Sequence, residues 1–182
     1  MVSYGIIGCG MMGQEHLRNI ALLPEARVVA IFEPNQIMAG AAKAIAPNAQ
    51  LCASLDELLA IEALDCLLIA SPNHLHVGQF DQIAATRHLP LLIEKPLFTR
   101  AEDVTRLAEL DASYMAPIWV GMEYRYMPPI QTFIDQLDAA TGGPTMLTIR
   151  EHRFPFLEKV GDWNRFHRNT AHWLRYAVTS ST

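Results

Sequence analysis

The chain has 182 residues, enough for one domain of ordinary size and part of a second. Apolar residues make up 51% and charged residues 18%, so we expect a packed core and no wholesale disorder. The formal net charge of −5 argues against a nucleic-acid-binding domain, which usually carries a basic excess. No apolar stretch approaches the roughly 20 residues that span a bilayer. Three cysteines without metal-ligand spacing predict reduced thiols in a cytoplasmic protein.

Strands and helices alternate before residue 122. Apolar runs predict strands at 4–8, 27–32, 50–52, 64–70, 89–93 and 118–120. Helical patterns lie between them at 11–23, 37–45, just after Ser54, 77–85 and 99–112. Capping boxes are expected at two of the helix starts, Ser54 with Glu57 and Thr99 with Glu102. This alternation predicts an α/β fold with a doubly wound parallel (Rossmann) sheet.

The pattern changes after this series, and we expect a domain boundary there. Residues 127–137 have a helical pattern, 141–144 a turn and 145–154 a strand. We therefore assign residues 1–121 to the Rossmann domain. Residues 122–182 would form the incomplete start of a second domain, reached through a tight crossover near 121–128.

A glycine-rich loop follows the first predicted strand and opens a helix. It contains Gly8, Cys9, Gly10, Met11, Met12 and Gly13, which form a GxGxxG pattern. In this context Gly8 permits a tight turn, Gly10 lets the backbone approach a pyrophosphate, and Gly13 allows close packing of helix on strand. The free N–H groups and positive dipole end of the helix suit phosphates. The sequence therefore predicts a dinucleotide site, and the alternative is an ordinary glycine turn.

Glu33 stands twenty residues after Gly13, at the end of the second predicted strand. A carboxylate there accepts hydrogen bonds from the adenosine ribose hydroxyls and repels a 2′-phosphate. No arginine stands beside it, so we predict NAD as the cofactor and NADP as less likely. The alternative is a surface glutamate.

Two further segments follow the fourth and fifth predicted strands. They are Ser71-Pro72-Asn73-His74-Leu75-His76 and Glu94-Lys95-Pro96. Together with the glycine loop they resemble the Gfo/Idh/MocA oxidoreductases, the family of glucose-fructose oxidoreductase and inositol dehydrogenase. The resemblance extends to about residue 170. It implies that the second domain is an α+β domain that covers the substrate.

The resemblance also implies roles at matching positions. The cofactor groove would be lined by Ser71, Pro72, Asn73 and His76. Glu94 and Lys95 would lie near the nicotinamide, with Lys95 as the catalytic residue that faces the substrate hydroxyl. The alternative for Lys95 is a surface lysine before a proline.

Other candidate residues give weaker indications of function. His74 and His76 lie two residues apart without a third ligand, so we expect no metal site. Arg125 fits an anchor at the domain interface better than a substrate contact. Trp163 and Arg165 could approach substrate. The basic residues between 150 and 175 fit a polar domain surface better than a nucleic-acid patch, because the rest of the chain is acidic.

The chain departs from the family pattern from about residue 171. The resemblance implies a Gly-rich turn and a helix with a His and an Asp, whereas residues 171–182 offer only His172. Their permitted codons, read one base earlier, can spell Gly-Thr-Leu-Val-Glu-Ile-Cys-Cys-His-Phe-Phe-Asp, which is similar to that turn and helix. Our hypothesis is a frameshifted, truncated family member, and the alternative is a short paralogue with an unrelated tail.

Two classes of function follow. The first is an NAD-dependent oxidoreductase that acts on the CH–OH group of a polyol or sugar, as the resemblance to inositol dehydrogenase implies. The second is a non-catalytic dinucleotide-binding protein or a gene remnant. The expected partner is a small-molecule substrate, and we expect no binding to nucleic acid or to a membrane. The resemblance implies a homo-oligomer, because the family is typically homo-oligomeric.

Overall fold

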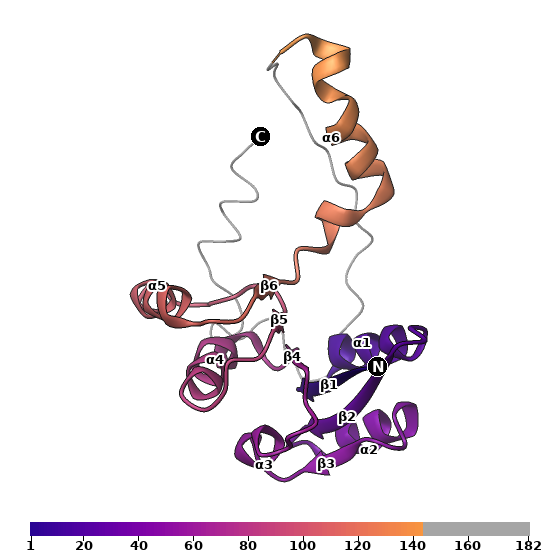
Figure 1. The fold of residues 1–182 in the computed structure, drawn as a ribbon, viewed down its shortest axis with the longest axis vertical. Coiled ribbons are helices and arrows are strands. Elements are labelled where there is room, and N and C mark those ends of the chain that lie inside the picture. The colour runs from indigo at the N-terminus through magenta and orange to yellow at the C-terminus, as the bar shows by residue number, and fades with distance from the viewer. Residues whose placement is uncertain (144–182) are drawn as a thin grey trace.

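The computed structural model describes residues 1–143, which contain a six-stranded parallel sheet (Figure 1). The strand order is β3-β2-β1-β4-β5-β6, and every neighbouring pair is parallel. The strands are β1 (Val2–Ile7), β2 (Ala26–Phe32), β3 (Gln50–Cys52), β4 (Cys66–Ile69), β5 (Leu91–Ile93) and β6 (Ile118–Val120). This order confirms the doubly wound fold predicted from the alternating pattern.

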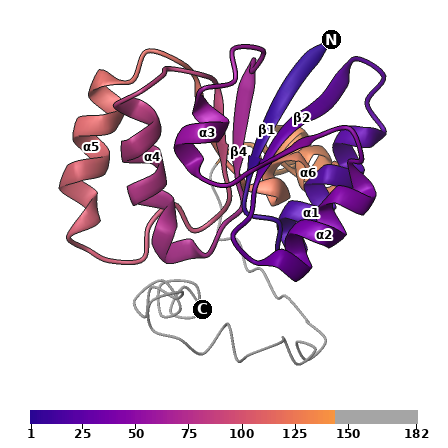
Figure 2. The same cartoon turned by 90° about the horizontal axis from the view of Figure 1, so that it is seen from below.

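Helices cover both faces of the sheet (Figure 2). They are α1 (Met11–Ala21), α2 (Gln36–Ile45), α3 (Leu55–Leu59), α4 (His76–Ala84) and α5 (Asp103–Ser113), with short 3₁₀ turns η1 (Asn73–Leu75) and η2 (Glu123–Tyr126). Neighbouring residues of a strand point to opposite faces, so two cores form. One joins Ile7 and Ile69 to α3, α4 and α5, and the other joins Ile6 and Leu68 to α1 and α2.

The strand order reverses between β1 and β4. The crossover after β1 leads to β2 on one side, whereas β4 and β5 continue on the other. In doubly wound folds the ligand crevice lies at such a reversal, outside the carboxyl ends of the strands, which here are β1 and β4. All the predicted site segments follow strands that end at this edge.

One of the two predicted capping boxes is confirmed in its N-cap bond. Ser54 Oγ accepts from Glu57 N at 3.1 Å, but the Glu57 carboxylate accepts from Ala53 N at 2.7 Å, one residue before the N-cap. The second box, Thr99 with Glu102, is wrong. Thr99 is buried and α5 begins later, at Asp103, with Glu102 as an N-cap that makes no side-chain capping bond.

The last described helix is α6 (Pro128–Thr141), longer than the helix predicted at 127–137. It is joined to β6 through η2 and extends away from the sheet (Figure 1). Its apolar residues Ile130, Phe133 and Ile134 are exposed, and Gly142 and Gly143 follow with positive φ, as the predicted turn requires. The strand expected at 145–154, the basic stretch and the altered tail lie outside the described residues.

Within residues 1–143, no helix combines the length and the apolar character needed to cross a membrane.

The domain boundary at 121/122 stays a prediction.

Candidate functional site

The carboxyl ends of four strands bring the predicted site segments together. The glycine loop follows β1, Glu33 follows β2, Ser71 follows β4 and Glu94 follows β5. Within this edge Gly8 N donates to Phe32 O at 2.9 Å, so the glycine loop and the end of β2 are joined directly. Residues far apart in sequence therefore lie at one edge of the sheet.

The three glycines of the loop differ in what a side chain would meet. Gly8 has φ +88°, and a Cβ there would lie 2.4 Å from Ser71 Cα. A Cβ at Gly13 would lie 2.1 Å from Gly8 O. A Cβ at Gly10 would have nothing within 4 Å. Gly8 and Gly13 are therefore required by packing, whereas Gly10 leaves open space in front of the helix.

The N-terminus of α1 opens into this space. Gly10 is its N-cap residue and makes no side-chain capping bond. The next two residues, Met11 and Met12, are exposed. An 11-residue helix that starts on an uncapped glycine presents backbone N–H groups and the positive end of its dipole, the arrangement that binds phosphates.

Glu33 holds the loop from the β2 side. Its Oε2 accepts from Cys9 N at 2.6 Å and its Oε1 accepts from Asn35 N at 2.8 Å. Cys9 is fully buried, and burial, with the Glu33 charge nearby, raises the pKa of its thiol to about 12. The Cys9 thiol is therefore neutral at physiological pH and is no nucleophile.

The segment after β4 is held by hydrogen bonds of its own. Ser71 is buried, and its Oγ donates to Gln79 Oε1 at 2.5 Å. Pro72 O accepts from Leu75 N at 2.8 Å, which closes η1. Asn73 is half-buried at the start of η1. Ser71, Pro72 and Asn73 thus lie just beyond the carboxyl end of β4, and their contacts with a cofactor stay predictions.

His76 lies beneath this segment. Its side chain is fully buried, with Nε2 2.9 Å from Ser71 O and Nδ1 2.9 Å from Pro96 O. Burial lowers the pKa of His76 and outweighs the two hydrogen bonds, which raise it. A neutral imidazole has one N–H, so His76 donates to one of the two carbonyls in each tautomer. It links the segments after β4 and β5, and its predicted place in the cofactor groove stays untested.

The buried His76 makes stability depend on pH. A histidine whose folded pKa is lowered binds a proton in the unfolded chain first, so stability falls as the pH drops through about 6.5. We expect His76→Gln to be less stable than the wild type at about pH 7.5, with a gap that narrows by about pH 5.5. Urea unfolding at both pH values measures this gap. A gap that stays constant would contradict a neutral, buried His76.

Glu94 lies at the end of β5 and is also buried. Its Oε1 lies 2.7 Å from His16 Nε2, and its Oε2 accepts from Lys95 N at 3.2 Å. Burial raises the pKa of Glu94, but the hydrogen bonds and charges of His16 and Lys95 together outweigh it, so the pKa lies below its usual value. Lys95 is exposed and precedes a cis peptide bond to Pro96.

His16 is a site residue that the sequence analysis missed. It stands one helical turn after Gly13 on α1, a spacing that places it on the side of the helix facing the loop. This spacing is the one sequence signal that could have pointed to it. The contact with Glu94 bridges 78 positions and needs the folded sheet.

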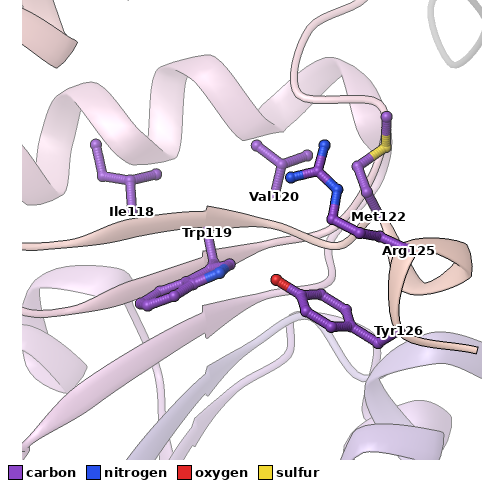
Figure 3. A pocket seen from close by; sticks show the side chains of 6 residues that line it. All are labelled: Ile118, Trp119, Val120, Met122, Arg125 and Tyr126. Carbon is purple, nitrogen blue, oxygen red and sulfur yellow. The ribbon is translucent and has the colours of Figure 1, made fainter. Parts of the chain in front are cut away.

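Arg125 lies on η2, beside β6. With Trp119, Met122 and Tyr126 it lines an open hollow of about 320 Å³, and its guanidinium lies between Val120 and Met122 (Figure 3). Its side chain is exposed, and both of its predicted roles stay open. The described residues contain no group of three potential metal ligands.

The family of the chain is shown by comparison with known proteins. A family model described as an oxidoreductase family with an NAD-binding Rossmann fold matches residues 2–122. The chain belongs to this family, Gfo/Idh/MocA. The match confirms the predicted resemblance and fold class, and NAD as the predicted cofactor.

Individual family members are similar over most of this chain. Inositol 2-dehydrogenase of Corynebacterium glutamicum is 32% identical over 153 residues, which cover 83% of this chain and 45% of that protein. Rhizopine catabolism protein MocA of Rhizobium meliloti is 29% identical over 139 residues, 76% of this chain and 43% of its own.

Solved structures of the family agree with this fold. Myo-inositol dehydrogenase from Lactobacillus casei, in complex with NAD(H) and myo-inositol, superposes with a TM-score of 0.71 at 27% identity. The alignment covers 78% of this chain and 42% of that one. The Gfo/Idh/MocA chain described here therefore spans less than half the length of these relatives.

Proposed function

We propose that this chain binds NAD(H) across the β1–β4 crevice, as the cofactor-binding part of an oxidoreductase acting on CH–OH groups. The observation that carries the proposal is the uncapped N-terminus of α1 beside Glu33. Gly10 leaves open space there, and the Glu33 carboxylate lies against the same loop, bonded to Cys9 N. This combination of free N–H groups and one carboxylate fits a pyrophosphate followed by a ribose.

The residues present divide the crevice into two halves. Glu33 on the β2 side would accept hydrogen bonds from the adenosine ribose, and the first turn of α1 would hold the pyrophosphate. The nicotinamide half then falls on the β4–β5 side, where Ser71, Asn73 and Lys95 lie. When bound, NAD⁺ supplies the hydride acceptor, and the chain supplies binding and orientation.

Lys95 is the proposed catalytic residue. Its ammonium would donate a hydrogen bond to the hydroxyl oxygen of the substrate and stabilise the negative charge there as the hydroxyl proton passes to a separate base, which the family resemblance places on the His-bearing helix of the second domain. The exposed side chain at a strand terminus supports this role, because it leaves the amine accessible to a substrate in the crevice.

A polyol or sugar is the proposed substrate class. The support is the set of similar proteins named inositol 2-dehydrogenase. The second reading, a non-catalytic dinucleotide-binding protein, is separated from the first by one assay. The assay incubates the chain with NAD⁺ and a panel of inositols and sugars and follows the absorbance of NADH, and formation of NADH would exclude the non-catalytic reading.

Cofactor choice gives a sharper test. We expect NADH to bind about tenfold or more tightly than NADPH, because the Glu33 carboxylate repels a 2′-phosphate. Glu33→Gln removes this charge and should narrow the preference, whereas Glu62→Gln, at an exposed loop position, should leave it unchanged. Isothermal titration with both cofactors measures each affinity. NADPH binding equal to or tighter than NADH would overturn the proposal.

A further inference from the structure

A chain of hydrogen bonds links α1 to the proposed catalytic residue. His16 Nε2 lies 2.7 Å from Glu94 Oε1, and Lys95 N donates to Glu94 Oε2 at 3.2 Å. An ionised carboxylate only accepts hydrogen bonds, so His16 Nε2 carries the hydrogen. The His16 and Glu94 side chains are only 20% and 10% exposed, and the low exposure strengthens the contact.

Gly121 limits where the Glu94 carboxylate can lie. A Cβ at Gly121 would lie 3.2 Å from the carboxylate carbon and from each of its oxygens, closer than ordinary van der Waals contact. Gly121 N is itself fixed by donation to Ile93 O at 2.8 Å, so the backbone there does not give way easily. The carboxylate is therefore confined between α1 and the end of β6.

The opposite side of Lys95 meets a second histidine. His76 Nδ1, at the start of α4, lies 2.9 Å from Pro96 O. The residues before and after Lys95 thus each face a histidine from a different helix. Lys95 itself has a long flexible side chain, so the direction of its ammonium depends on a fixed backbone.

We propose that His16 is a positioning residue that fixes, through Glu94, the direction in which Lys95 faces the nicotinamide half of bound NAD(H). The inference rests on the proposed function, because that function assigns the nicotinamide half to the β4–β5 side. His16 stands in the second turn of α1, whose first turn would hold the pyrophosphate. The same helix would therefore position both the cofactor, through its first turn, and the segment that carries Lys95, through His16.

The test compares NADH with ADP-ribose, which has the same adenosine and pyrophosphate but no nicotinamide. His16→Leu removes the donor and is expected to weaken NADH binding about fivefold while changing ADP-ribose binding less than about twofold. His16→Gln keeps an N–H donor of similar reach and is expected to retain both affinities. A residue that only stabilised α1 would affect both ligands equally and would not be rescued by glutamine.

Gly121→Ala is a second variant that leaves α1 untouched. Its added Cβ crowds the Glu94 carboxylate from the other side and is expected to produce the same selective loss of NADH affinity. It keeps the inference testable if His16→Leu does not fold. Equal losses for both ligands, or none, in the folded variants would overturn the inference.

The exchange rate of the Lys95 amide separates this inference from the proposed function. Release of Glu94 in His16→Leu should accelerate exchange at Lys95 N, and His16→Gln should restore the wild-type rate. If the wild type binds neither NADH nor ADP-ribose, the proposed function fails. The hydrogen-bond chain is then supported by accelerated exchange and refuted by an unchanged rate.

Discussion

Replacement of Gly13 by alanine is expected to abolish measurable NADH binding and to lower the free energy of unfolding by about 3 kcal/mol. The new Cβ would lie 2.1 Å from Gly8 O and 3.0 Å from Gly8 C, both backbone atoms. Gly8 cannot move away from the new methyl group, because it packs closely on Ser71. A Cβ built at Gly8 would lie only 2.4 Å from Ser71 Cα. The helix must therefore move away from β1, which opens the core and shifts the phosphate-binding turn.

Two other glycines provide matched controls. Gly10→Ala adds a methyl group where nothing lies within 4 Å, so we expect unchanged stability but weaker NADH binding, because the methyl occupies the proposed pyrophosphate space. Gly40→Ala lies in α2, away from the glycine loop, with nothing within 4 Å, so it should bind normally and gain about 0.5–1 kcal/mol from reduced backbone freedom.

Urea unfolding measures the stability of the three variants, and isothermal titration measures their affinity for NADH. The expected result is a loss of both stability and binding at Gly13, of binding alone at Gly10, and of neither at Gly40. A Gly13→Ala protein as stable as the wild type would show that the loop adjusts freely. The close packing of α1 on β1 would then not be the reason for that glycine.

The sheet could be predicted because each buried strand is encoded locally. Val28 to Phe32 and Leu67 to Ile69 are continuous apolar runs, and strands covered on both faces need such runs. Predicted strand ends differ from the observed ones by a few residues, most clearly at β4 and β5. There Leu64 and Leu89 are apolar but precede the paired segments. Apolar character marks burial, and hydrogen-bonded pairing begins only where the neighbouring strand is in register.

The site was predictable in its segments and less so in its contacts. A GxGxxG loop and a carboxylate after β2 follow from local sequence, since each needs only its own strand and helix. The contacts of Glu94 with His16 and of His76 with Pro96 depend on which strands are neighbours. At Thr99 the local sequence predicted a helix cap that the fold does not form, because the Thr99 side chain is buried.

Replacement of Glu94 by glutamine is expected to lower the free energy of unfolding by about 2 kcal/mol at neutral pH. The carboxylate accepts from His16 Nε2 and from Lys95 N in a largely buried position, and bonds to a charged acceptor are worth more than neutral ones. Glutamine has the same shape but no charge, so both contacts lose the strength that the ionised carboxylate gives them.

The pH dependence of this loss identifies its cause. Burial raises the pKa of Glu94, but the hydrogen bonds and charges of His16 and Lys95 together outweigh it, so the folded pKa lies below that of the unfolded chain. The stability that Glu94 contributes is then fully present above the unfolded pKa of about 4.3 and is lost as the pH falls through the folded pKa. The gap between wild type and Glu94→Gln should thus close in acid.

A double-mutant cycle with His16→Leu completes the test. If the carboxylate acts through His16, the second substitution should cost little once the first is present, leaving a coupling free energy of about 1 kcal/mol or more in urea unfolding at neutral pH. Additive losses would mean that Lys95 N and Gly121 hold Glu94 without help from α1. A cycle that couples at neutral pH and loses its coupling in acid is expected only if an ionised Glu94 meets an N–H of His16 in the folded protein.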